Sequence, residues 1–158
     1  MIEFLTEFFL QYGRFLTVVI LSLMPLIELR GALPVAVFAL DYEPLTALLI
    51  AYPASVLPAP FIILLIRRIF EFLDRFRVFQ KINAKILART ESKHAAKIER
   101  YGLLGLFIIV AIPLPGTGVW SGSLAAAVFR LPFFKALFVI LAGNLVAALV
   151  ITLITFLI

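Results

Sequence analysis

Apolar residues fill two blocks of this chain, and a basic segment separates the blocks. The first block has an apolar run over residues 14–40, the acidic turn "DYEP" and a second apolar run over 45–66. The second block has runs over 103–129 and 136–158, separated by the basic stretch "RLPFFK". A helix of roughly 20 apolar residues crosses a hydrocarbon core about 30 Å thick. The pattern therefore predicts an all-α integral membrane protein.

Composition agrees with this class. Of the 158 residues, 64% are hydrophobic and 15% are charged, values outside the range of soluble domains. The absence of cysteine excludes disulfides, thiol catalysis and thiolate metal sites. Glu3 and Glu7 precede a single Arg14 at the start, opposite to the basic beginning of a signal peptide, so we interpret the whole chain as mature protein.

Each block opens with a 27-residue run that is interrupted near its middle, by "PLIELRGALP" (25–34) and by "PLPGTG" (113–118). These runs are either kinked crossings or re-entrant hairpins. Twelve helical residues cover about 18 Å, enough to reach the middle of a bilayer and turn back. Proline and glycine at the interruptions disfavour a continuous helix. At membrane depth, the resulting irregular backbone is tolerated only where protein or water satisfies its polar groups.

Charge favours the hairpins. The connection 67–100 holds ten of the fourteen basic and four of the nine acidic residues, a net charge of +6. Such a connection is expected on the cytoplasmic side of a multi-pass cell-membrane protein. Hairpins keep Arg130 and Lys135 on that side as well, whereas full crossings place them outside.

The predicted fold is a single membrane domain over 1–158 made of two inverted repeats, 14–66 and 102–158, joined by the connection 67–101. Each repeat is a re-entrant helical hairpin followed by one transmembrane helix, and pairing Leu45 with Ala136 aligns the repeats. Hairpin tips that meet near the midplane are a recurrent design of secondary transporters.

Apolar residues recur every three or four positions over 69–86 within the connection, which predicts an amphipathic helix on the inner membrane surface. Its basic residues are expected to contact membrane lipid rather than nucleic acid.

Glu28 and Arg30 are the charges at the first hairpin tip, where a buried charge costs about 2.5–3.5 kcal/mol. Positions two apart face each other in an extended segment but not in a helix, so the pair predicts a non-helical tip. Two interpretations stay open. In the first, the pair only fixes the hairpin, as a buried salt bridge or by bonds to free carbonyls. In the second, Arg30 contacts an anionic group such as phosphate while Glu28 accepts and releases a proton.

The stretch "PLPGTG" is either a plain turn or a turn with an anion-binding helix start after Gly118, which Thr117 is able to cap. A second helix start is expected after Gly31. Trp120 and Ser121 either line the tips or pack nearby, and Asn144 forms an interhelical hydrogen bond or joins the cavity. The candidate substrate- or proton-binding residues are Glu28, Arg30, Gly31, Pro34, Pro113, Pro115, Gly116, Thr117, Gly118, Trp120, Ser121 and Asn144.

Enzyme templates do not fit. The chain has one histidine, no metal-binding spacing, no nucleophile beside a base, and neither a P-loop nor a dinucleotide fingerprint. We predict no enzymatic activity, no cofactor and no metal.

The motif "ELRGALP" (28–34) followed by "PLPGTGVWSG" (113–122) resembles the small multidrug export proteins, relatives of the DedA and VTT-domain (SNARE-associated) membrane proteins. The resemblance implies two re-entrant hairpins packed against transmembrane helices. DedA-like relatives are associated with proton-dependent transport and with moving lipid carriers such as undecaprenyl phosphate. Residues 113–122 lack the arginine that DedA proteins typically place beside proline there.

Together these features predict a small polytopic transporter with a midplane site between the hairpins. It is expected to be proton-coupled and flippase-like, moving an anionic or amphipathic substrate such as a polyprenyl phosphate or phospholipid. Because few spans enclose a site poorly, we expect a homodimer or larger assembly. One alternative is an exporter of cationic drugs with Glu28 as counter-ion, and another is a non-transporting scaffold that docks partners on its basic helix.

Overall fold

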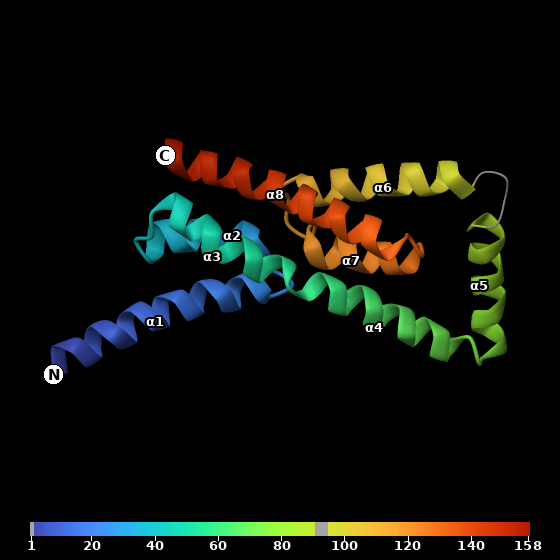
Figure 1. Cartoon of the computed structure of the whole chain (residues 1–158), viewed down its shortest axis with the longest axis horizontal. Helices are drawn as coiled ribbons and strands as arrows, with labels where there is room; N and C mark the ends of the chain where they lie inside the picture. Colours follow the sequence, from blue (N-terminus) through green and yellow to red (C-terminus); the bar gives the residue numbers. More distant parts are fainter. Residues whose placement is uncertain (1, 91–94) are drawn as a thin grey trace.

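The computed structural model describes residues 2–90 and 95–158, and the part of the predicted connection at 91–94 lies outside the described residues. The described chain is built of helices and turns, which confirms the all-α prediction (Figure 1). In chain order the elements are α1 (Ile2–Leu23), α2 (Glu28–Pro34), the π-helix η1 (Val35–Ala39), α3 (Pro44–Val56), α4 (Pro58–Leu73), α5 (Arg77–Thr90), α6 (Ala95–Ala111), α7 (Val119–Val128) and α8 (Phe133–Leu157).

Two helical stretches among the described residues are long and apolar enough to cross a membrane. They are Pro44–Leu73, which combines α3 and α4, and Phe133–Leu157, which is α8. Both agree with the predicted spans at 45–66 and 136–158. Proline lies at the first position of α3 and of α4, where its missing N–H leaves no helical bond unmade.

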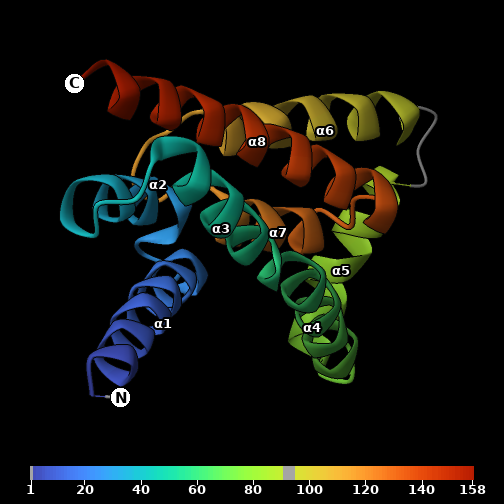
Figure 2. The same ribbon diagram turned by 60° about the vertical axis from the view of Figure 1, so that its left-hand side comes forward.

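The described residues form two apolar cores, and the long helices connect them. One core joins α1, α2, η1 and α3 with the second half of α8 through Ala148 and Ile151. The other joins α6, α7 and the first half of α8 with α4 through Ala59 and Ile63. Figure 2 shows α8 running along the top of the molecule, above α3 and α7, while α1 and α4 diverge below. Each core therefore depends on a helix from the other half of the chain.

The predicted amphipathic helix at 69–86 is divided in the structure. Helix α4 ends at Leu73, three residues form tight turns, and α5 begins at Arg77 in a new direction (Figure 1). The prediction of one continuous helix is therefore wrong. Asp74 lies at this break and pairs with Arg130 across 3.6 Å, which ties the corner to the turn between α7 and α8.

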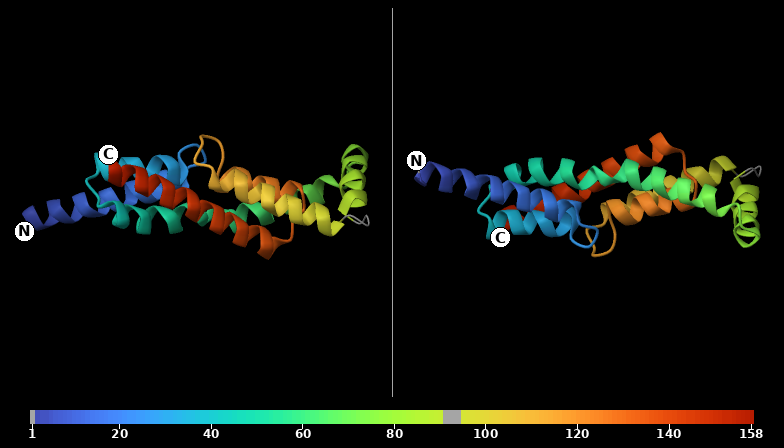
Figure 3. Two further views of the ribbon diagram at one scale, coloured as in Figure 1. Left: turned by 90° about the horizontal axis from the view of Figure 1, so that it is seen from above. Right: turned by 90° about the horizontal axis from the view of Figure 1, so that it is seen from below.

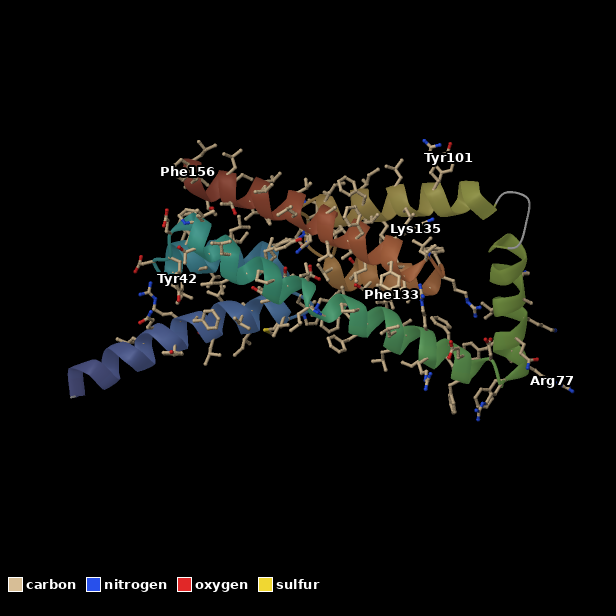
Figure 4. The ribbon with its side chains drawn as sticks, in the orientation of Figure 1. Tyr42, Arg77, Tyr101, Phe133, Lys135 and Phe156 are labelled. Carbon is tan, nitrogen blue, oxygen red and sulfur yellow. The ribbon has the colours of Figure 1, made fainter. Side chains whose placement is uncertain are left out.

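At the opposite end of the molecule, α1 is held against the turn at 40–43. The guanidinium carbon of Arg14 lies 5.0 Å from the centre of the Tyr42 ring, a cation–π contact (Figure 4). Asp41 in this turn and Arg130 in the α7–α8 turn both have positive φ, 53° and 51°. Each turn thus contains one left-handed charged residue, and the two residues have opposite charge.

Helices α3 and α8 begin at Pro44 and Phe133, a separation of 89 residues. The predicted pairing of Leu45 with Ala136, at a separation of 91 residues, stays a prediction.

Candidate functional site between the two turns

Two turns meet in the middle of the molecule. The chain turns back at 24–27 between α1 and α2, and at 112–118 between α6 and α7. Both views in Figure 3 show these turns side by side. The first turn is followed at once by Glu28, and the second ends at Gly118, so the predicted charged tip and the predicted anion-binding tip are neighbours.

Glu28 caps the start of α7 from the other half of the chain. Its Oε1 accepts a hydrogen bond from the Trp120 backbone N–H at 3.0 Å, and its Oε2 accepts one from Val119 N–H at 3.3 Å. The first N–H groups of a helix lack partners within the helix and carry its positive dipole end. A carboxylate therefore already fills the helix start that the sequence offered to an anionic ligand.

Arg30 satisfies the opposite kind of helix end. Its Nη2 donates to the carbonyls of Val110 at 2.8 Å and Ile112 at 3.2 Å, where α6 finishes. Its Nη1 donates to Glu28 Oε2 at 3.0 Å. The two side chains are 10% and 5% exposed, so the pair is buried. Glu28 and Arg30 are kept at the tip by each other and by the broken helix ends of the second hairpin.

The backbone at Glu28 is what lets these two side chains meet. Glu28 has φ of 47°, in the left-handed region that costs a non-glycine residue on the order of 1–3 kcal/mol. Arg30 lies within the first turn of α2, so the prediction of an extended tip is wrong. The left-handed conformation of Glu28, rather than an extended segment, lets the side chains of Glu28 and Arg30 meet.

The helix start expected after Gly31 is also wrong. Helix α2 begins at Glu28, which leaves Gly31 and Pro34 inside it. Pro34 has no N–H to give to the turn before it, and the following residues widen into η1, where Leu40 N–H reaches Val35 O at 3.1 Å.

The second turn holds itself together by local bonds. Helix α7 starts at Val119 as predicted, but Thr117 does not cap it: Thr117 Oγ1 donates to the carbonyls of Ile112 and Leu114, both at 2.8 Å. Ser121 Oγ donates to Gly118 O at 3.3 Å, within the first turn of α7.

Trp120 contributes a third link between the halves. Its indole Nε1–H donates to the carbonyl of Leu23 at 3.2 Å, at the end of α1. Together with the bonds of Glu28 and Arg30, this contact means that three of the four broken helix ends at the turns receive a partner from the opposite turn region.

A cavity of about 370 Å³ lies beside these contacts. Of the predicted site residues, its lining includes Glu28, Arg30, Gly31, Pro113, Pro115, Gly116 and Thr117. Pro25, Leu26 and Ile27 also line it, although sequence reasoning did not select them as site residues; Pro25, as a helix breaker, was the available signal. Pro34, Gly118, Trp120, Ser121 and Asn144 are not among its lining residues.

Asn144 lies away from this cavity, in the contact between α8 and α3. Its Nδ2 donates to Ser55 Oγ at 2.8 Å, and both residues are fully buried. The interhelical hydrogen bond is confirmed. Close by, Tyr52 donates its hydroxyl to Leu141 O at 3.0 Å.

Within the residues that the structure describes, no cluster of three or more histidine or acidic side chains is placed to hold a metal ion. The absence of a metal or cofactor stays a prediction.

The described residues thus form a helical protein with a buried charged pair that caps broken helices, a cavity beside this pair, and two helical stretches long and apolar enough to cross a membrane. Residues 28–150 match the model of the family described as "Putative small multi-drug export protein", and the chain belongs to this family. The matched range includes the charged pair and the whole second turn. No curated protein and no solved structure matches the chain. The resemblance to small multidrug export proteins is thus confirmed, while the relation to DedA proteins stays a prediction.

Proposed function

We propose that the protein is a small proton-coupled transporter whose substrate site is the cavity between the two turns. The observation that carries the proposal is the seat of the Glu28 carboxylate, made by Arg30 and the two N–H groups that begin α7, at the wall of this cavity. Three donors that hold one carboxylate are suited to hold another anion of similar size.

Proton coupling follows from the exchange of these two anions. When Glu28 takes up a proton, its attraction to Arg30 and to the positive end of α7 is lost. The seat then accepts the anionic group of a substrate, such as the phosphate of a polyprenyl phosphate or phospholipid. When Glu28 releases its proton on the other side of the membrane, its carboxylate returns to the seat and displaces the substrate anion. In this scheme Glu28 and the substrate anion compete for one seat.

The inverted, re-entrant arrangement is part of the same proposal. Helices α3 and α8 begin 89 residues apart, and two contacts between them join residues at the same separation: Tyr52 with Leu141, and Ser55 with Asn144. Equivalent residues meet where a two-fold axis passes between two related elements. Such an axis between α3 and α8 supports repeats of opposite orientation, with hairpin tips at the midplane.

The test is transport by the full chain in liposomes, with fluorescent polyprenyl phosphate or phospholipid and with or without a pH gradient. Glu28→Gln cannot release a proton, and Arg30→Ala removes the charge from the seat, so both are expected to lose at least about tenfold in rate. Glu43→Gln makes the same charge change in the exposed turn at 40–43 and is expected to keep the wild-type rate. If the wild-type protein moves none of these lipids under any gradient, the proposal of an anionic lipid substrate is wrong.

Drug export is the second candidate, because the family description names multidrug export, and the acidic Glu28 is suited to a cationic drug. Glu28 would then exchange Arg30 for the cation of the drug. Uptake of a cationic dye that is lost in Glu28→Gln, in liposomes where no lipid moves, would select this candidate. The scaffold interpretation instead expects no transport at all, together with loss of partner binding when Lys81, Lys85 and Arg89 are neutralised.

A further inference from the structure

A second, smaller cavity of about 170 Å³ lies far along the chain from the turn site, where α4 passes the end of α7. Its lining is Arg67, Phe70 and Glu71 from α4, with Ala127 and Arg130 from the end of α7 and the turn after it. In Figure 4 this region lies near the labelled Phe133 and Lys135 at the start of α8. It is on the side of the molecule where α4 runs toward α5. The cavity is outside the transport site proposed above.

Two arginines line this small space without full partners. Arg67 donates from Nη2 to the carbonyl of Leu131, but its Nε is buried and has no hydrogen-bond partner within the described part of the chain. Buried donors are nearly always bonded, so an orphaned guanidinium N–H indicates a missing acceptor. Arg130 Nη2 lies 3.6 Å from Asp74 Oδ2, a long contact that leaves guanidinium N–H groups able to donate to a further anion.

The backbone is arranged to bring the second arginine here. Arg130 has φ of 51°, a left-handed conformation that is strained for a residue other than glycine. It follows α7 directly, where a helix end carries negative partial charge and favours a nearby cation. Leu131 N–H bonds to Ala126 O at 3.0 Å and Arg130 N–H bonds to Ala127 O at 3.1 Å, the Schellman pattern in which the residue after a helix is left-handed. The turn that ends α7 therefore places Arg130 at the cavity.

The neighbourhood suits a phosphate that belongs to a lipid. Leu64, one helical turn before Arg67, is 56% exposed, and Phe129 beside Arg130 is 67% exposed. Arg67 lies near the end of the apolar stretch Pro44–Leu73, and Arg130 lines the same cavity. In the proposed topology this end meets the cytoplasmic face of the membrane, where phospholipid headgroups lie. An acyl chain along α4 would leave its phosphate level with the cavity, and guanidinium groups bind phosphate with paired hydrogen bonds.

We propose that Arg67 and Arg130 form a phosphate-binding site for the headgroup of an anionic phospholipid. The ligand's phosphate takes the parts of the Arg67 and Arg130 guanidinium groups that line the cavity. Glu71 also lines the cavity, and its carboxylate repels an anion there, so it weakens phosphate binding. The site does not depend on transport at the two turns.

The test is native mass spectrometry of the full-length protein in detergent, with added phosphatidylglycerol or phosphatidylcholine of equal chain length. Wild type is expected to retain phosphatidylglycerol preferentially, and Arg67→Gln and Arg130→Gln to bind it about tenfold more weakly, the loss of one charged hydrogen bond. Arg68→Gln is the matched control, because its side chain is next along α4 but lines a different hollow with Glu71, Phe72 and Arg75.

One variant separates the proposal from simple misfolding. Glu71→Gln removes the opposing carboxylate, so it is expected to bind phosphatidylglycerol several-fold more tightly, a gain that damaged folding does not produce. Inorganic phosphate is added in a parallel series. Phosphate retained without lipid preference, and lost in Arg67→Gln and Arg130→Gln, would identify a free phosphate as the ligand of the same site. Equal adducts in Arg67→Gln, Arg130→Gln and Arg68→Gln would overturn the proposal in favour of a diffuse basic surface.

Discussion

At the scale of single residues, the turn site depends on a glycine as much as on its charges. Gly118 has φ of 145°, and a Cβ there would overlap Glu28 Oε2 and Arg30 Nη1. Only glycine lets the start of α7 approach the charged pair this closely. The glycine thus acts by leaving space for a carboxylate from the other half of the chain.

Gly118→Ala is accordingly expected to push Glu28 off α7 and to lower stability by about 1–3 kcal/mol. Thermal unfolding of the purified protein in detergent measures this. Gly105→Ala is the control, since an added Cβ there meets nothing within 4 Å and alanine favours a helix by about 1 kcal/mol. Equal unfolding temperatures for the two variants would mean that the capping contact contributes little.

Sequence reasoning found the charged pair because two buried charges demand compensation, and it found Gly118 because a helix restart was expected there. It raised free carbonyls as possible partners of the charged pair, but it did not find which carbonyls bond to Arg30 and Trp120. These partners are the carbonyls of Val110, Ile112 and Leu23, groups that every residue carries and that no side chain marks. The seat of Glu28 is equally hidden, because Val119 and Trp120 offer backbone N–H groups from 91 and 92 residues away.

At the scale of elements, hydrophobic length predicted the two long helices well, since apolar runs translate directly into helix. The breaks were harder. Local residues suggested a helix restart after Gly31, whereas the contact of Glu28 with α7 moves the start to Glu28 and forces Pro34 into a helix that widens after it. The end of α4 at Leu73 lay inside a regular amphipathic pattern and had no local signal.

The contact between α3 and α8 gives a test at this scale. Ser55 and Asn144 are fully buried, and Asn144 Oδ1 has no hydrogen-bond partner among the described residues. Ser55→Ala would leave the whole amide unpaired and is expected to cost about 1–2 kcal/mol. Adding Asn144→Leu to that variant removes the orphaned amide and should restore part of the loss. Additive losses in unfolding by a harsh detergent would show that the hydrogen bond does not couple the helices.

At the scale of the whole molecule, each apolar core needs a helix from the opposite half, so neither half is complete by itself. Helix α8 carries Ala148 and Ile151 into the first core, and α4 carries Ala59 and Ile63 into the second. This exchange places the two turns at the centre and the turns at 40–43 and 129–132 at opposite ends (Figure 1). Which membrane face each end meets is the remaining prediction.

Cysteine labelling decides between re-entrant hairpins and full crossings, because the chain has no cysteine of its own. Asp41→Cys lies in an exposed turn and is expected to react from outside the cell in both arrangements. Phe134→Cys, at a position 82% exposed at the start of α8, separates them. With re-entrant hairpins it reacts with an impermeant maleimide only after the membrane is opened, because the α7–α8 turn shares the side of the basic connection. Reaction of Phe134→Cys in intact cells would instead make α6 and α7 a full crossing, and the midplane site would lose its second tip.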